Sequence, residues 1–232
     1  MNGLDLHHRL ENNLGLLIFG ILFVTSIGGL VQILPSIFQE SLKTPSKNIH
    51  LYQPLELAGR DIYIREGCNT CHSQMIRPFR SETERYGEYS KSGEFVYDHP
   101  FLWGSKRTGP DLHRVGGKYP DSWHFHHMLE PTAISPGSIM PAYPWLYEQD
   151  VDRASTGAKI RAMQSLGVPY PEGYADQAEA DMDEQAQGIV KSLEIDGFGS
   201  SPDKEIIALI AYLQRLGTDI KNTDDVQASN SK

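Results

Sequence analysis

The residues of this chain that can do chemistry gather in one short box, C-x-x-C-H, which runs from Cys68 to His72. This spacing indicates covalent attachment of a c-type haem. On a helix, Cys68 and Cys71 lie three positions apart and share a face, so each thiol can form a thioether with one vinyl group of the haem. His72 follows at the next position, where its imidazole can bind the iron as an axial ligand.

Three other kinds of site use two cysteines at this spacing: a redox pair, half of a zinc site and a structural disulfide. A zinc site needs a second Cys or His pair, and the chain has no third cysteine. A thioredoxin-like redox pair accompanies a βαβ pattern, which the sequence around the box does not have. The box therefore predicts one covalent haem. A single box also argues against di-haem peroxidases and multihaem electron carriers.

Met140 is the predicted sixth ligand of the iron. It lies in a segment bounded by Pro136 and Pro141, which is expected to be a non-helical strap that can cross the open face of the haem. Met75 follows His72 too closely to reach the other side of the iron. The remaining candidates have the spacing or setting of packing or surface residues: Met163, Met182, His113, His124, His126 and His127. A His/Met pair fills both axial positions and raises the potential, so the haem is expected to carry electrons and not to bind substrate.

Pro110 is the predicted partner of the axial histidine. It lies in the segment R-T-G-P-D-L, from Arg107 to Leu112. Its carbonyl can accept the Nδ1–H of His72, which would orient the ring and raise its basicity. The alternative is an ordinary Gly-Pro turn.

Around this site, the composition predicts a largely water-soluble chain. It has 232 residues, of which 22% are charged and 39% hydrophobic, enough for one or two small domains. The net charge of −9 is uneven: residues 59–118 carry +2 and residues 119–232 carry −10. Such asymmetry bears on partners and solubility, and the acidic balance argues against a nucleic-acid partner.

One segment, Leu14 to Leu34, has no charged residue. Its 21 residues are long enough to cross a bilayer. The apolar region of a cleaved signal peptide is shorter and ends at an A-x-A-like site, which is missing here. We therefore expect an uncleaved, single-pass anchor in a bacterial inner (cytoplasmic) membrane. Lys and Arg counts are a poor guide to its orientation, but c-type haem is attached outside energy-coupling membranes, so the haem domain should be periplasmic.

The chain is expected to be mainly α-helical and to fall into four parts. These are an anchor (1–38), an extended linker (39–54), a mono-haem domain (55–217) and a polar tail (218–232). Periodic apolar residues and caps predict helices over 55–66, 122–129 with Asp121 as N-cap, 148–167, 174–194 and 203–216. The helix before the box should place three residues against the haem edge: Leu57, Ile62 and Tyr63.

With these motifs placed, the chain resembles one family, the membrane-anchored mono-haem subunit (subunit II, CcoO) of the cbb3-type haem–copper cytochrome c oxidases. The resemblance runs from about Tyr52 to Tyr147. It rests on P-L-E-L-A-G-R (54–60), R-E-G-C (65–68), C-H-S-Q-M-I-R-P (71–78), E-R-Y-G (84–87), L-W-G-S-K-R-T-G-P-D-L (102–112) and M-P (140–141). Where the family often has Asn-Pro-Arg before the strap, this chain has Glu130-Pro131-Thr132.

The resemblance implies a class I-like cytochrome c domain with helical insertions and His72/Met140 ligation. It further implies an electron-transfer subunit with no catalysis of its own. Electrons would come from the di-haem cytochrome c subunit and pass to the b-type haems of the catalytic subunit, which reduces dioxygen. Two alternatives stay open: the mono-haem subunit of a nitric oxide reductase, and a free-standing anchored shuttle or haem-based sensor.

The segment W-G-S-K-R, from Trp103 to Arg107, is the predicted docking edge toward the catalytic subunit. Its adjacent bases, Lys106 and Arg107, could neutralise haem propionates there. A serine hydroxyl suits a hard cation. In the resembled family a calcium ion lies at this boundary, so Ser105 is a candidate Ca²⁺ ligand. The alternative is a solvated basic turn.

Overall fold

A computed structural model describes residues 3–220, and within them it has helices but no β-strand. The α-helices are α1 (Gly3–Asn12), α2 (Leu14–Phe38), α3 (Pro54–Arg65), α4 (Cys68–Cys71), α5 (Arg80–Tyr86), α6 (Asp121–Leu129), α7 (Pro131–Ile134), α8 (Thr156–Ser165), α9 (Tyr174–Ile195) and α10 (Glu205–Arg215). Three 3₁₀ turns are η1 (Glu40–Leu42), η2 (Ser92–Glu94) and η3 (Pro144–Tyr147). The predicted mainly helical class is confirmed.

The chain forms two compact units, Met1–Thr44 and Pro45–Lys232. This division falls inside the expected linker, and the four-part division of the chain stays a prediction.

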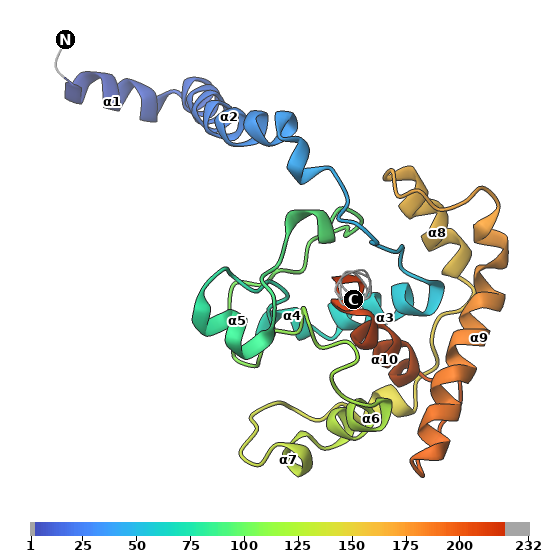
Figure 1. The fold of residues 1–232 in the computed structure, drawn as a ribbon. Helices are drawn as coiled ribbons and strands as arrows, with labels where there is room; N and C mark the ends of the chain where they lie inside the picture. The colour runs from blue at the N-terminus through green and yellow to red at the C-terminus, as the bar shows by residue number, and fades with distance from the viewer. Residues whose placement is uncertain (1–2, 221–232) are drawn as a thin grey trace, which may run out of the picture. The chain divides into compact units, whose positions relative to one another are not determined.

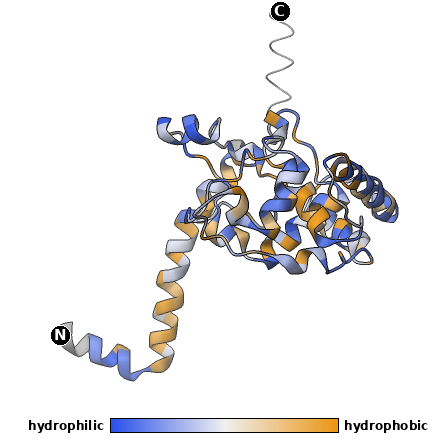
Figure 2. Ribbon diagram, turned by 90° about the horizontal axis from the view of Figure 1, so that it is seen from below, coloured by the Kyte–Doolittle hydropathy of each residue, from blue (hydrophilic) through white to orange (hydrophobic). Residues whose placement is uncertain are grey.

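The first unit contains α2, the uncharged helix expected from the sequence. It has 25 residues and a mean hydropathy of 2.4, and none of it is buried against other parts of the protein. Figure 2 shows that most of the helix has hydrophobic colouring. The side chain of Asn13 caps the helix by accepting from the Leu16 amide at 3.0 Å, and the Thr25 hydroxyl donates to the Ile21 carbonyl. By length and composition α2 is a candidate membrane span.

The second unit is built around the pair α3 and α10, which lie side by side at its centre (Figure 1). The helices approach so closely that a Cβ on Gly59 would lie 1.8 Å from the Ala208 carbonyl oxygen. Only glycine fits there. Most of α10 is buried, from Glu205 to Leu213, as expected for a helix that is apolar on nearly every side. Gly217 ends this region with a φ of +71°.

Helices α8 and α9 pack together and cover another side of α3. They enclose a second apolar cluster: Leu57, Ile160, Met163, Val168, Tyr170 and Ala178. The prediction that Leu57 faces the haem edge is therefore wrong, because its side chain fills this cluster. Ile62 and Tyr63 lie in the main core. Met163 and Met182 are buried core residues.

Two predicted helix starts are also wrong. Residues 148–155 are not helical, because their backbone pairs with the segment before α10: Val151 N donates to Asp203 O at 2.8 Å, and Asp150 bridges to Lys204. Asp121 lies in the first turn of α6, and Pro120 holds the cap position. The Asp121 carboxylate accepts from the Gln214 amide at 2.7 Å, so a tertiary contact uses the group expected to cap the helix.

Candidate haem site

The box forms a single helical turn, α4, immediately after α3. Gly67 separates the two helices with a left-handed backbone, φ +71° and ψ +23°, a conformation that glycine adopts without strain. Both cysteines are free thiols; Cys68 is partly buried and Cys71 exposed. Burial raises the pKa of the Cys68 thiol to about 12. His72 leaves the turn in an extended conformation, while its amide still donates to the Cys68 carbonyl at 2.9 Å.

The His72 ring is held by the segment that the sequence singled out. Its Nδ1 lies 2.8 Å from the Pro110 carbonyl oxygen, the contact predicted above. A Cβ on Gly109 would lie 2.3 Å from His72 Cε1, so the missing side chain makes room for the ring. Burial lowers the pKa of His72, which favours the neutral imidazole that metals bind. With Nδ1 engaged, Nε2 is the nitrogen left for the iron.

A buried carboxylate ties the two sides of this arrangement together. Asp111 accepts from the Ser73 hydroxyl at 2.6 Å, from the Met75 amide at 2.8 Å and from the His113 amide at 2.9 Å. The Leu112 amide donates to the Ser73 carbonyl at 2.8 Å. The residues after His72 and those after Pro110 are thus joined at several points, which fixes the His72 ring relative to its acceptor.

Arg107 belongs to the same internal network and not to an exposed edge. Its guanidinium donates to the Ser73 hydroxyl, to the Met75 carbonyl and to the Glu82 carboxylate, each at 2.7 Å. The hydrogen bond from Arg107, with a second from Arg77, lowers the pKa of Glu82 to about 2. Arg107 thus makes three hydrogen bonds inside its own domain, and its contact with haem propionates stays a prediction.

Residues 138–143, which contain Met140, are non-helical, as predicted for a strap. Met140 is partly buried and packs against the main core, as Cys68, Leu112 and Tyr143 do. The Tyr143 amide donates to the Met128 carbonyl of α6 at 2.8 Å. This bond brings the end of the strap back onto α6.

Two aromatic residues that sequence reasoning missed connect the strap to the box. The Trp145 indole Nε1 donates to the Glu66 carboxylate, two residues before Cys68, at 3.0 Å. Burial raises the pKa of the Tyr143 hydroxyl, and the charges that Cys68 and Cys71 would carry raise it further. Tyr143 packs against the same main core as Cys68. The conspicuous A-Y-P-W run after Met140 was the available signal for both residues.

These residues fit a haem c. Such a cofactor needs two thiols and two axial ligands. Here the two free thiols lie on one turn, the histidine has one nitrogen engaged, and the thioether lies on a strap that returns to the same core. The missing Cβ at Gly109 gives the histidine ring its place. In addition, Nδ1 of His127 is a buried nitrogen without a hydrogen-bond partner in residues 3–220, and it lies on the α6 segment to which the strap returns.

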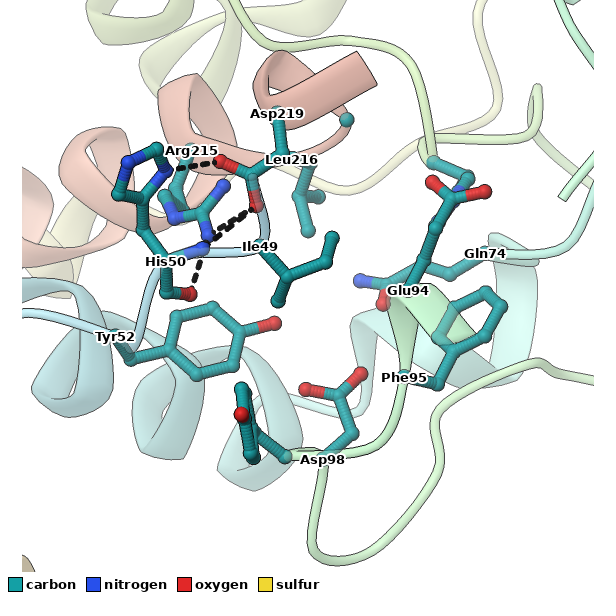
Figure 3. A pocket seen from close by; sticks show the side chains of 13 residues that line it. Ile49, His50, Tyr52, Gln74, Glu94, Phe95, Asp98, Arg215, Leu216 and Asp219 are labelled. Atoms are coloured by element: carbon teal, nitrogen blue, oxygen red, sulfur yellow. Dashed lines mark hydrogen bonds and ion pairs between the residues drawn. The ribbon is translucent and has the colours of Figure 1, made fainter. Parts of the chain in front are cut away.

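A small polar cavity also lies in the second unit (Figure 3). Its volume is about 40 Å³, far below the roughly 300 Å³ at which ordinary ligand pockets begin. The hydroxyl of Tyr52 and the carboxylate of Asp98 point into it (Figure 3). The Asp219 carboxylate closes one end by accepting from Arg215 at 2.6 Å, beside the His50 ring at 2.8 Å. The cavity contains none of the predicted haem residues.

The other candidate residues have ordinary packing or surface roles in the structure. His113 is buried against Glu94, with 2.9 Å between Nε2 and a carboxylate oxygen, and His124 is 1% exposed. Ser105 is exposed. In the described part of the chain, no three His, Cys, Asp or Glu side chains form a metal cluster, so the calcium site stays a prediction.

A family model described as "Cytochrome C oxidase, mono-heme subunit/FixO" matches residues 7–220, which is most of the chain. No curated protein matches it.

Proposed function

We propose that this chain, which belongs to the FixO family of mono-haem cytochrome c oxidase subunits, holds its haem c through Cys68, Cys71, His72 and Met140. The hydrogen bond from His72 to the Pro110 carbonyl, made possible by Gly109, carries this assignment. Membership of the family supports an electron-transfer subunit with one haem c. A bound haem c supplies one-electron transfer and binds no substrate when both axial positions are filled.

Each residue has a defined part in this arrangement. The two thiols fix the cofactor covalently to α4. His72 presents Nε2 to the iron, because Pro110 holds Nδ1 and Asp111 locks the surrounding loops. Met140 presents its sulfur from the strap, whose far end is tied to Met128. Water is kept from this side by the apolar core against which Met140 packs.

We further propose that electrons enter from a di-haem cytochrome c subunit and leave toward the b-type haems of a catalytic haem–copper subunit, with α2 in the inner membrane and the haem domain in the periplasm. The docking edge is assigned to Phe101, Trp103 and Lys106. The Phe101 and Trp103 rings stack at 4.4 Å and are 52% and 37% exposed. The Trp103 carbonyl accepts from the Gln74 amide at 2.9 Å, so this edge adjoins the segment after the box. Ca²⁺ at Ser105 would need oxygen ligands from the partner.

The ligation is tested by Met140→Leu. The purified domain should lose the low-spin His/Met spectrum and its potential should fall, while the covalent c-type band survives denaturation. An unchanged spectrum and potential would show that another residue is the sixth ligand.

The assembly is tested by purifying the intact chain in mild detergent and recording spectra of the haems that accompany it. Co-purified b-type haem with an oxidase that consumes dioxygen is the expected result. Nitric oxide reduction by the purified complex would place the chain in the alternative enzyme. A chain that always purifies with its own haem alone would be a free-standing shuttle.

A further inference from the structure

The segment that follows the strap is tied to a residue just before the haem box. The indole Nε1 of Trp145 donates to one carboxylate oxygen of Glu66 at 3.0 Å, although the two residues are 79 positions apart in the chain. The other carboxylate oxygen of Glu66 accepts from Nε of Arg65 at 2.8 Å. The Glu66 side chain is only 13% exposed, so water competes little with these two donors.

Glu66 belongs to a closed ring of hydrogen bonds. The Arg65 guanidinium donates to both carboxylate oxygens of Glu205, at 2.7 and 2.5 Å, and Glu205 is buried at the start of α10. The Glu205 amide donates to the Gln149 carbonyl at 3.1 Å, and the Gln149 amide donates to the Trp145 carbonyl at 2.9 Å. The ring thus joins the end of α3, the start of α10 and residues 145–149. Linked hydrogen bonds of this kind strengthen one another, and those to charged groups are the stronger ones.

Trp145 is the member of the ring that lies next to the strap. It follows Met140 by five residues, and its ring packs edge-on against the Tyr143 ring at 5.3 Å. The Tyr143 amide donates to the Met128 carbonyl at 2.8 Å, and the Leu146 side chain is fully buried in the main core. Residues 143–146 therefore anchor the strap on its C-terminal side.

We propose that Trp145 is a positioning residue for the sixth ligand: its hydrogen bond to Glu66 keeps the strap closed, so that the Met140 sulfur stays on the iron. This inference rests on the proposed His72/Met140 ligation and deepens it. Glu66 lies two residues before Cys68, one of the two attachment points of the haem. A strap fastened to Glu66 is therefore fastened to the segment that carries the cofactor.

The test uses the intact chain with its haem and measures the binding of added imidazole. Imidazole can bind the ferric iron only in the fraction of molecules whose Met140 sulfur has left it, so its apparent affinity rises with that fraction. Trp145→Phe keeps an aromatic ring but removes the N–H. The apparent affinity should rise about two- to tenfold, the equilibrium effect of one hydrogen bond. The weak red absorption band of the ferric Met–iron bond should still be present before imidazole is added.

Two further variants separate this hydrogen bond from a general loosening of the domain. Glu66→Ala removes the acceptor and should also raise the affinity, and adding Trp145→Phe to it should give no further rise, because the two residues act through one bond. Gln164→Met is the matched control. It removes a hydrogen bond of the same length, 3.0 Å from the side-chain amide to the Pro171 carbonyl, in α8, and should leave imidazole binding as it is.

If Trp145→Phe yields no stable holoprotein, Glu66→Gln replaces it. Glutamine keeps the shape and an acceptor but loses the charge, so the affinity should rise in the same direction by a smaller factor. Unchanged imidazole affinity in the variant that is used would overturn the proposal.

Two other results would also overturn it. An equal rise in Gln164→Met would mean general loosening, and fully additive effects of the Trp145 and Glu66 substitutions would mean that the two residues act separately. Failure of the underlying ligation looks different, since the Met–iron band would then be missing from the parent protein or would survive Met140→Leu.

Discussion

At Gly109, the volume that a side chain would need is already taken by the His72 ring. An added Cβ would lie 2.3 Å from Cε1 and 2.7 Å from Nδ1. Moving the ring away would also break its hydrogen bond to Pro110. This glycine is therefore a positioning residue for the axial histidine, although it has no functional group.

We expect Gly109→Ala to destabilise the domain by about 1–3 kcal/mol, the usual cost of overpacking, and to lower the fraction of chains that carry haem. Covalent haem per protein and urea unfolding of the holoprotein measure the two effects. Gly199→Ala is the matched control, because nothing lies within 4 Å of a Cβ there. Equal haem content and stability in both variants would remove Gly109 from the site.

Also at the residue scale, Glu94 makes the fold sensitive to acid. Its buried carboxylate accepts from both terminal nitrogens of Arg114, at 2.5 and 2.9 Å, and lies 2.9 Å from the His113 ring. Burial alone would raise the pKa of Glu94, but the hydrogen bonds from His113 and Arg114 outweigh it and lower the pKa to about 2. A carboxylate with a depressed pKa stabilises the folded state above its unfolded pKa of about 4.3.

This stabilisation should be lost as the pH falls from about 4.5 toward 2, and it amounts to about 3 kcal/mol at most. Glu94→Gln keeps an acceptor and most of the shape but cannot titrate. We expect the variant to be less stable at neutral pH and to lose less stability than the parent on acidification. Denaturant unfolding of both proteins across this pH range measures the difference. Parallel stability curves would show that Glu94 does not contribute.

At the scale of elements, the crossing of α3 and α10 holds the box in place, because α4 follows α3 after only two residues. Gly59 sets the distance between the two helices: a Cβ there would lie 1.8 Å from the Ala208 carbonyl oxygen and 2.9 Å from Tyr212 Cβ. Backbone atoms cannot yield as a flexible side chain can, so the helices themselves would have to separate.

Gly59→Ala should therefore cost about 3 kcal/mol or more, the upper part of the overpacking range. Gly188→Ala, in the exposed part of α9 with nothing within 4 Å, should instead stabilise by about 0.5–1 kcal/mol, because alanine favours a helix over glycine. Thermal unfolding of the two variants beside the parent gives both values. If Gly59→Ala matched Gly188→Ala, the close crossing would not be a determinant of stability.

At the scale of the whole molecule, α2 is a candidate membrane span. Its apolar side chains are exposed along its length; Phe19 is 66% and Val24 67% exposed. Such a surface needs either lipid or removal of the segment. The family match begins at residue 7 and so includes α2.

We expect the mature protein to retain α2. Intact mass spectrometry decides this, and a mature N-terminus near residue 39 would contradict the anchor. Phe23→Arg should impair insertion, since an arginine at mid-helix costs about 2.5–3.5 kcal/mol on insertion scales. The fraction of protein in washed membranes measures it. Phe38→Arg, at the end of α2, is the control and should have a smaller effect.

The sequence by itself determined the features that depend on local spacing. The C-x-x-C-H box, the uncharged run that became α2, the glycine stop after α10 and the non-helical segment around Met140 follow from chain-local chemistry. The Pro110 contact was also readable, because a Gly-Pro pair leaves its carbonyl free to accept. The family could also be predicted from the sequence, because the motifs that identify it are contiguous.

Tertiary structure decided the features that depend on which distant segments meet. Arg107 looked like an exposed base, but its guanidinium lies between Ser73 and Glu82. Leu57 has the periodicity of a haem-facing residue, yet α8 and α9 cover that side of α3. Residues 148–155 do not continue a helix, because their backbone bonds to the segment before α10. Helical periodicity in a sequence shows that one face of a helix is apolar, but it does not show which element covers that face. Likewise, the sequence does not show which group pairs with a charged side chain, because the fold brings the two together.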